Sequence, residues 1–240
     1  MAEELPLVHT SRCKFLPELA KNGHISPRRC EVFQESLIYL FYGRPAYRSK
    51  QGRSAGESIV LCPVCFVFKP RTVSRNVARV FPCDTGALHK GIFQPHLTAA
   101  DIKELELDPA IESARRYVHF FFKTNGNYFL GKVNRSMSAP NYEATQKLYQ
   151  LLLSSVPSKF DDRKSAVEVQ TREKLFLKDQ LLYVVLPCEF LDDVNIREAI
   201  FEHWNCDPIL YPTFDGDAPN QYYSVLREKL GQRFMDSKRI

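Results

Sequence analysis

Strand-like and helix-like segments follow one another in this chain without a regular order, and this mixture constrains the fold more than any other feature. Runs rich in aromatic and branched residues predict strands at 5–11, 36–42, 58–69, 165–171 and 181–187. Apolar residues at helical spacing predict helices at 14–23, 108–123, 139–155 and 194–205. The regular strand–helix–strand alternation of a doubly wound parallel sheet is missing, so we predict an α+β fold.

Other segments carry weaker patterns. Residues 127–133 are predicted to form a small strand or a loop, and the charged segment 231–240 is predicted to fray. Residues 49–57 and 70–98 are punctuated by Gly or Pro and are predicted to be long loops. Long loops in a compact domain are often functional.

The size of the chain and its first residues bound its organisation and location. The sequence has 240 residues and 44% hydrophobic residues, which predicts one globular domain spanning 1–240. No apolar run approaches the roughly 20 residues needed to cross a bilayer. The first six residues carry Glu3 and Glu4 and no basic residue, unlike a secretory signal. We therefore expect a cytoplasmic protein without a membrane partner.

The seven cysteines favour free thiols over a disulfide framework. Cys62 and Cys65 lie in an apolar run, "SIVLCPVCFVFKP", and free buried thiols are typical of a reducing compartment. The same pair is half of a zinc site at best, because a closed site needs two more ligands. We expect these cysteines to be core residues and expect no metal.

Charge is concentrated in one part of the chain. Eight basic residues and a single acid, Glu57, lie between Arg44 and Arg79. A local positive field attracts polyanions or the pyrophosphate of a dinucleotide, although an ordinary solvated face would have the same composition. At the start of this region, rings and cations alternate in "YGRPAYR" (42–48). Rings stack on flat groups, and guanidinium groups bind phosphates, so this stretch suggests a flat, phosphorylated ligand.

Three strand-like segments share a chemical character although they lie far apart in the sequence. One ends in His9-Thr10-Ser11, one ends at 42–48, and one carries Glu168 between two valines. The set resembles the ADP-ribosyltransferase superfamily, in its H-Y-E branch of diphtheria-toxin-like and poly-ADP-ribose-polymerase-like enzymes. Within this branch, "HTSRCKFLPELAKNGHISP" is similar to bacterial toxins that modify nucleic acids, and "SAVEVQTREKLFLKDQLLYVVLP" is similar to their late strand with a catalytic glutamate.

The resemblance covers roughly residues 5–70 and 160–190, and it implies a fold. Split mixed or antiparallel β-sheets with flanking helices are expected. Residues 71–160 match nothing specific and are expected to be a family-specific insertion or a helical part.

The resemblance also implies roles for residues at the two ends of the site. His9 would hydrogen-bond the adenine-side ribose of NAD, and Thr10, beside Ser11, would hold the nicotinamide amide through its backbone. Glu168 would be the catalytic acid that bonds the nicotinamide-side ribose hydroxyl, and Glu173 is the alternative. The polymerases follow the histidine with Gly, where this chain has Thr10.

Four residues of the aromatic and basic stretch would complete the NAD site. Tyr42 or Tyr47 would stack on the nicotinamide ring, and Tyr42 is the catalytic candidate of the two. Arg44 or Arg48 would meet the pyrophosphate. A metal is not part of this arrangement.

The implied function is an NAD-dependent ADP-ribosyltransferase that transfers ADP-ribose to a macromolecule. The basic region favours a nucleic acid, RNA or DNA, as the acceptor. Such enzymes act as toxins in toxin–antitoxin or anti-phage defence systems, so an antitoxin protein is an expected partner. Two alternatives stay open: an NAD glycohydrolase effector with water as the acceptor, and a non-catalytic nucleic-acid-binding module.

Overall fold

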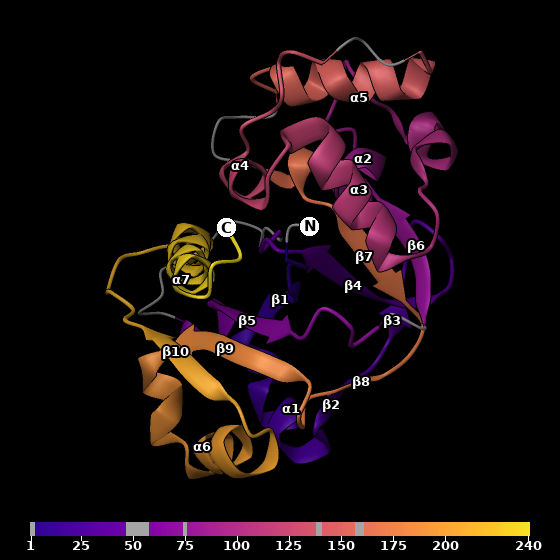
Figure 1. The fold of residues 1–240 in the computed structure, drawn as a ribbon. Coiled ribbons are helices and arrows are strands. Elements are labelled where there is room, and N and C mark those ends of the chain that lie inside the picture. Colours follow the sequence, from indigo (N-terminus) through magenta and orange to yellow (C-terminus); the bar gives the residue numbers. More distant parts are fainter. Residues whose placement is uncertain (1–2, 47–57, 74–75, 138–140, 157–160) are drawn as a thin grey trace.

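The computed structural model describes residues 3–46, 58–73, 76–137, 141–156 and 161–240. An eight-stranded sheet runs through it in the order β10-β9-β5-β1-β4-β7-β6, with β3 paired to the edge of β4 (Figure 1). The strands of this sheet are β1 (Leu7–Arg12), β3 (Arg28–Arg29), β4 (Ser36–Tyr42), β5 (Pro63–Phe68), β6 (Val77–Phe81), β7 (Glu168–Thr171), β9 (Leu181–Pro187) and β10 (Asp207–Tyr211). A separate ribbon pairs β2 (His24–Ile25) with β8 (Leu175–Phe176). The predicted α+β fold is confirmed.

The sheet divides at its centre. Strand β1 pairs with β5 along its whole length, from Leu7 to Arg12, but it pairs with β4 only at Leu7 and Val8. Beyond Val8 the two strands part, and β4 continues to pair with β7 on its other side. One half of the sheet is therefore β4-β7-β6, and the other half is β1-β5-β9-β10. These two halves meet at a seam of two residue pairs.

Helices cover the two halves from different sides (Figure 1). Helices α3, α4 and α5 lie over the β4-β7-β6 half, whereas α1 and α6 lie below the other half and α7 lies above it. The helices are α1 (Leu16–Asn22), α2 (Thr85–His89), α3 (Ile111–Phe122), α4 (Asn125–Leu130), α5 (Glu143–Leu153), α6 (Val194–Glu198) and α7 (Tyr222–Asp236). A 3-10 turn, Cys13–Phe15, leads from β1 into α1.

A single large core joins the two halves and includes the cysteines of the apolar run. Phe66 and Trp204 meet edge to face in it, with ring centroids 6.0 Å apart. Cys62 and Cys65 are both fully buried there, as the sequence predicted. Within the described part of the chain, the helices are too short or too polar to cross a membrane.

The sequence-based prediction is wrong in two helical segments. Where a strand or loop was predicted at 127–133, helix α4 forms, because the Thr124 hydroxyl caps its start and Gly131 ends it in the left-handed conformation at φ 70°. Of the tail predicted to fray, residues 231–236 belong to α7, which buries Leu226, Leu230 and Phe234 on one face, and 237–240 follow the helix. Packing of this apolar face stabilises the charged helix.

Residues 70–98, predicted to be a loop, also differ from expectation, since they contain β6 and α2. Among its described residues, the wider stretch 71–160 carries helices α2 to α5 and a single strand, β6. The predicted loop at 49–57 lies outside the described residues.

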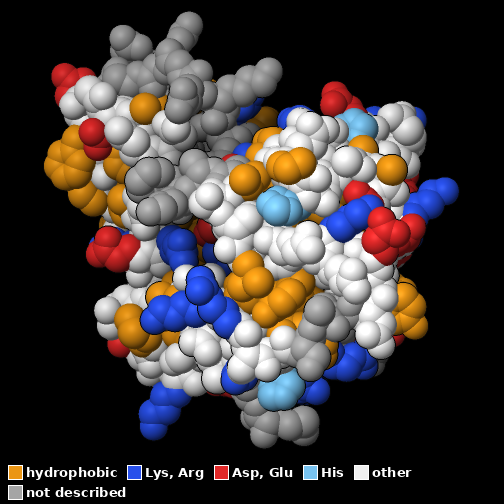
Figure 2. Space-filling model, turned by 90° about the horizontal axis from the view of Figure 1, so that it is seen from above, with side chains coloured by type: hydrophobic (Ala, Val, Ile, Leu, Met, Phe, Trp, Pro, Cys, Tyr) orange, Lys and Arg blue, Asp and Glu red, His pale blue; other side chains and the backbone are white. Residues whose placement is uncertain are grey.

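The two ends of the described chain meet on α4. The Nδ2 atom of Asn125 donates to the backbone oxygen of Glu3 at 2.8 Å and to that of Arg239 at 3.0 Å. Asn125 is buried, and the two chain ends lie side by side in Figure 1. On the face seen in Figure 2, basic, acidic and hydrophobic side chains are interspersed.

Candidate functional site

His9 occupies the opening where β1 leaves β4. Its Nδ1 atom lies 2.8 Å from the backbone oxygen of Tyr39 in β4, so a side chain bridges the two strands after their backbone pairing has ended. Its ring is tilted against Phe66, with centroids 6.4 Å apart. Burial lowers the pKa of His9 and the positive charge of Arg28 lowers it further, whereas the bond to Tyr39 opposes both. The imidazole is therefore neutral at pH 7.

Tyr39 connects this opening to the strand that carries Glu168. Tyr39 is paired with Gln170 of β7, and paired residues of an antiparallel ladder lie on the same face of the sheet. Gln170 and Glu168 are two positions apart in β7 and also share a face, so Tyr39 and Glu168 lie on the same face. The Tyr39 hydroxyl is hydrogen-bonded to the thiol of Cys30. Burial, this bond and the nearby Glu168 carboxyl raise the pKa of Tyr39, so its hydroxyl stays protonated.

Glu168 lies on the central strand of its half-sheet, between Phe41 of β4 and Phe81 of β6. Its side chain is only 1% exposed. The carboxyl accepts three hydrogen bonds: from the Thr85 backbone nitrogen at 3.0 Å, from the Thr85 hydroxyl at 2.7 Å and from Gln170 Nε2 at 2.6 Å. These bonds fix its orientation at the start of α2.

The electrostatics of this position favour a protonated carboxyl. Burial raises the pKa of Glu168 to about 8, and the neighbouring Asp84 carboxyl adds to the shift, whereas the bonds from Gln170 and Thr85 oppose it. Asp84 caps α2 by accepting from the Ala87 backbone nitrogen at 2.8 Å, and burial raises its pKa as well. Two carboxyl groups that disfavour each other's ionisation thus lie at one end of the half-sheet.

Tyr42 does not have the open ring that nicotinamide stacking requires. It is fully buried, its hydroxyl accepts from the Leu5 backbone nitrogen at 3.1 Å, and its ring is tilted against Tyr128 with centroids 6.4 Å apart. The Tyr128 hydroxyl in turn donates to the backbone oxygen of Tyr42 at 2.8 Å. The predicted stacking role of Tyr42 is therefore wrong, because the core already covers its ring.

Arg44 is also a structural residue. It is 1% exposed and donates to Asp162 Oδ2 at 2.8 Å, to Ser165 Oγ at 2.8 Å and to the Tyr128 backbone oxygen at 3.0 Å. Its guanidinium group also lies over the Tyr128 ring. The prediction that Arg44 meets a pyrophosphate is wrong, because this group ties the end of β4 to the segment before β7.

The other predicted site residues fall into three groups. Thr10 is buried and its backbone is paired with Cys65 of β5, whereas Ser11 is partly exposed on the same strand. Glu173, the alternative acid, is exposed beyond the end of β7. Tyr47 and Arg48 lie outside the described residues. The structure thus places His9 and Glu168 on the two strands that flank β4. Val8, Phe41 and Glu168 are level in the ladder and share a face, so His9, the next residue of β1, belongs to the opposite face.

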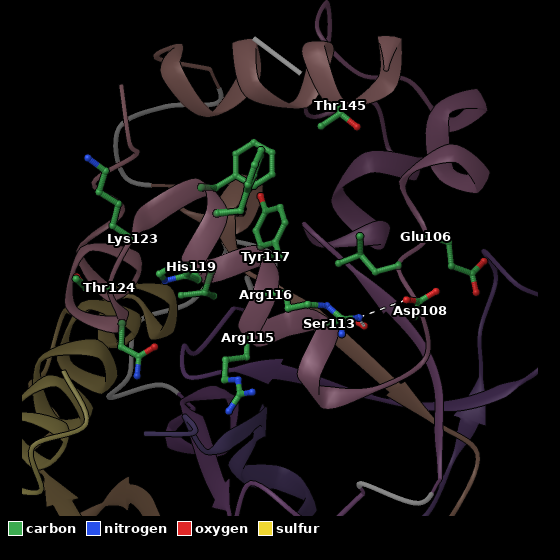
Figure 3. Close-up of a pocket in the computed structure, with 15 residues that line it drawn as sticks. Glu106, Asp108, Ser113, Arg115, Arg116, Tyr117, His119, Lys123, Thr124 and Thr145 are labelled. Atoms are coloured by element: carbon green, nitrogen blue, oxygen red, sulfur yellow. Dashed lines mark hydrogen bonds and ion pairs between the residues drawn. The ribbon is translucent and has the colours of Figure 1, made fainter. Parts of the chain in front are cut away.

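A separate hollow of about 850 Å³ lies along α3 (Figure 3). Its lining includes Arg115, Arg116 and Lys123 beside aromatic residues of the same helix. Arg116 is paired with Asp108 at 3.3 Å, and both side chains are well exposed. None of the site residues predicted from the sequence lines this hollow.

The described residues contain no cluster of three or more His, Cys, Asp or Glu side chains suited to hold a metal ion.

Two residues near the candidate site, Tyr39 and Arg28, were not among the site residues predicted from the sequence. The alternation of side chains along the predicted strand 36–42 shows which residues share a face with Tyr39. It does not show which neighbouring strand Tyr39 is paired with, and the proposed role of Tyr39 depends on that pairing.

Scans of protein-family models and of curated proteins found no match to this chain.

Proposed function

We propose that this chain is an NAD-dependent ADP-ribosyltransferase with a nucleic acid as the acceptor. The observation that carries the proposal is the link across the centre of the sheet: His9 of β1 bonds to the backbone of Tyr39, and Tyr39 shares a face of the half-sheet with Glu168. Through this link an imidazole and a carboxyl that are 159 positions apart in the chain lie on the two strands that flank β4, and a ligand that contacts both must pass through the opening between β1 and β4. The resemblance of both segments to the ADP-ribosyltransferases supports the same conclusion.

The chemistry explains why a carboxyl is needed. The bond between nicotinamide and the ribose carbon breaks, nicotinamide leaves with the electron pair, and positive charge develops on the sugar. An acceptor oxygen or nitrogen then bonds to the same carbon and loses its proton. A fixed carboxylate beside the sugar stabilises the transition state more than the ground state, and this difference accelerates the reaction.

His9 is prepared to hold a sugar hydroxyl. Its Nδ1 faces the backbone oxygen of Tyr39, which can only accept, so Nδ1 carries the proton. Its Nε2 atom is then an acceptor and can receive the proton of a ribose hydroxyl. The bond to Tyr39 thereby fixes both the tautomer and the orientation of the ring.

The proposal places a condition on Glu168. With 1% of its side chain exposed, the carboxyl can reach a substrate only if binding opens the packing around it. It must also be ionised to stabilise a positive sugar, and burial raises its pKa to about 8. The ionised fraction therefore increases as the pH rises from 7 to 9, and the rate of transfer should rise with it.

The decisive experiment incubates the protein with labelled NAD and separate pools of RNA, DNA and protein. We expect label in a nucleic-acid pool, and we expect Glu168→Gln to reduce transfer by roughly 100- to 1000-fold while the circular dichroism spectrum is retained. Glu173→Gln is the matched control, because this exposed residue lies five positions further on and should retain full transfer. Undiminished transfer by Glu168→Gln would refute the role of this carboxyl.

The enclosure of Glu168 favours one alternative, a non-catalytic nucleic-acid-binding module. A carboxyl that is buried and accepts three hydrogen bonds also serves as a structural cap of α2. Salt-dependent binding of RNA or DNA without NAD turnover would select this function. Release of nicotinamide without label in any pool would instead select an NAD glycohydrolase.

A further inference from the structure

Two cations share one aromatic ring beside the opening between β1 and β4. Phe15 belongs to the 3-10 turn that follows β1. The Lys14 ammonium lies 4.7 Å from the centroid of its ring, and the Arg28 guanidinium carbon lies 4.1 Å from it. Arg28 belongs to β3, which pairs with β4 at Leu37. The contact between Arg28 and Phe15 therefore connects the turn after β1 to the strand that pairs with the start of β4.

Neither cation is neutralised within the described part of the chain. No ion pair or hydrogen bond connects Lys14 or Arg28 to a described residue, and both side chains belong to exposed residues. A ring contact of this kind contributes about 0.5–1 kcal/mol at an exposed position and leaves the N–H donors unused. Two positive charges close to one ring also repel each other, so an anion that contacts both would relieve the repulsion.

The position of this pair relates it to the proposed site. The charge of Arg28 acts on His9, which lies at the opening itself. Arg44 is not available to a phosphate, because it is buried and bonds to Asp162 and Ser165. Arg28 thus lies near enough to His9 to lower its pKa, and neither Arg28 nor Lys14, which shares its ring, has a bonded partner among the described residues.

We propose that Lys14 and Arg28, held on the ring of Phe15, bind the phosphate groups of a nucleoside diphosphate, the ADP portion of the dinucleotide. This inference rests on the proposed function for the identity of the ligand. The guanidinium group of Arg28 offers paired donors to phosphate oxygens, and Lys14 adds a mobile point charge. His9 then receives the adjoining ribose hydroxyl.

The test uses ADP as the probe and isothermal titration calorimetry as the readout, on the full chain. We expect Arg28→Gln and Lys14→Gln each to weaken ADP binding by about 10-fold or more, the range of one charge-assisted hydrogen bond. The control is Arg29→Gln, since Arg29 is the neighbouring exposed cation, bonds to Gln34 and should bind ADP like the parent. Thermal unfolding checks that all variants fold.

Each outcome decides one of the two proposals. Failure of the parent to bind ADP, unchanged affinity in Arg28→Gln and Lys14→Gln, or an equal loss in Arg29→Gln would overturn the phosphate site. Normal ADP-ribose transfer with an unchanged KM for NAD in Arg28→Gln would overturn this site and leave the proposed function intact. Binding of ADP that depends on Arg28 without any NAD turnover would support this site and remove the proposed function.

Discussion

At the residue scale, Glu168 makes the stability of the fold depend on pH. Burial raises its pKa to about 8, above the ordinary value of 4.5, so the folded state holds a proton that the unfolded state has released. The contribution of this carboxyl is fully present below pH 4.5 and is lost as the pH rises towards 8. We expect the free energy of unfolding to fall by up to about 1.4 kcal/mol per pH unit over this window.

Urea unfolding at a series of pH values measures this slope, and Glu168→Gln provides the comparison. Glutamine has nearly the same shape as the protonated acid but does not titrate, so its stability should lose this part of the pH dependence. A parent and a variant with parallel pH profiles would show that the carboxyl does not hold its proton in the folded state.

Arg44 provides a second prediction at the same scale. Replacement of a buried partner leaves an uncompensated charge, so Arg44→Met should lower the free energy of unfolding by about 3–5 kcal/mol. Asp162 keeps one further cation, Arg227 at 3.4 Å, which favours the lower end of this range. Chemical denaturation checks the loss, and the exposed Arg29→Met should change stability by less than about 0.5 kcal/mol. An Arg44→Met variant of parental stability that had lost ADP binding would restore the anion-binding role.

At the scale of elements, the turn that ends β4 depends on a glycine. Gly43 has φ 65°, and a Cβ atom there would lie 2.5 Å from the Cδ1 atom of the fully buried Leu5. Gly131, at the end of α4, has φ 70° but open space around the same position. Gly131→Ala should therefore cost only the backbone strain of about 1–2 kcal/mol, and Gly43→Ala should cost about 1–3 kcal/mol more because Leu5 must move.

Guanidinium unfolding of the two glycine variants measures the difference. Both positions share the left-handed backbone, so the comparison isolates the steric contact with Leu5. Equal losses would mean that the core around β4 accommodates a methyl group without cost.

The elements that the sequence predicted best are those with an unambiguous local signal. The run 36–42 forms β4 with the same bounds, and Gly23 ends α1 in the left-handed conformation at φ 65°. Helix α4 was missed because six residues are too few to display a helical period. Helix α7 was missed because its sequence is rich in charged residues and its apolar residues are few. These apolar residues form one face of the helix, and this face packs against β5 in the folded chain.

At the scale of the whole molecule, the candidate site shows what sequence alone cannot supply. A polar strand end led to His9 and a strand glutamate between two valines led to Glu168, and the fold places them on the two strands that flank β4. The same reasoning failed for Tyr42 and Arg44, because composition does not tell whether an aromatic or basic side chain faces a ligand or the core. The place of Tyr39 depends on register between strands that are distant in the chain, and no local pattern encodes that register.

The double hydrogen bond of Asn125 has a consequence for protein engineering. The backbone oxygens of Glu3 and Arg239 both accept from the same side-chain nitrogen, so a short flexible linker could join these two residues into a circle. New ends could then be cut at the exposed turn after α4, near Gly131. Such a circular permutant would change the order in which the half-sheets leave the ribosome while preserving their contacts.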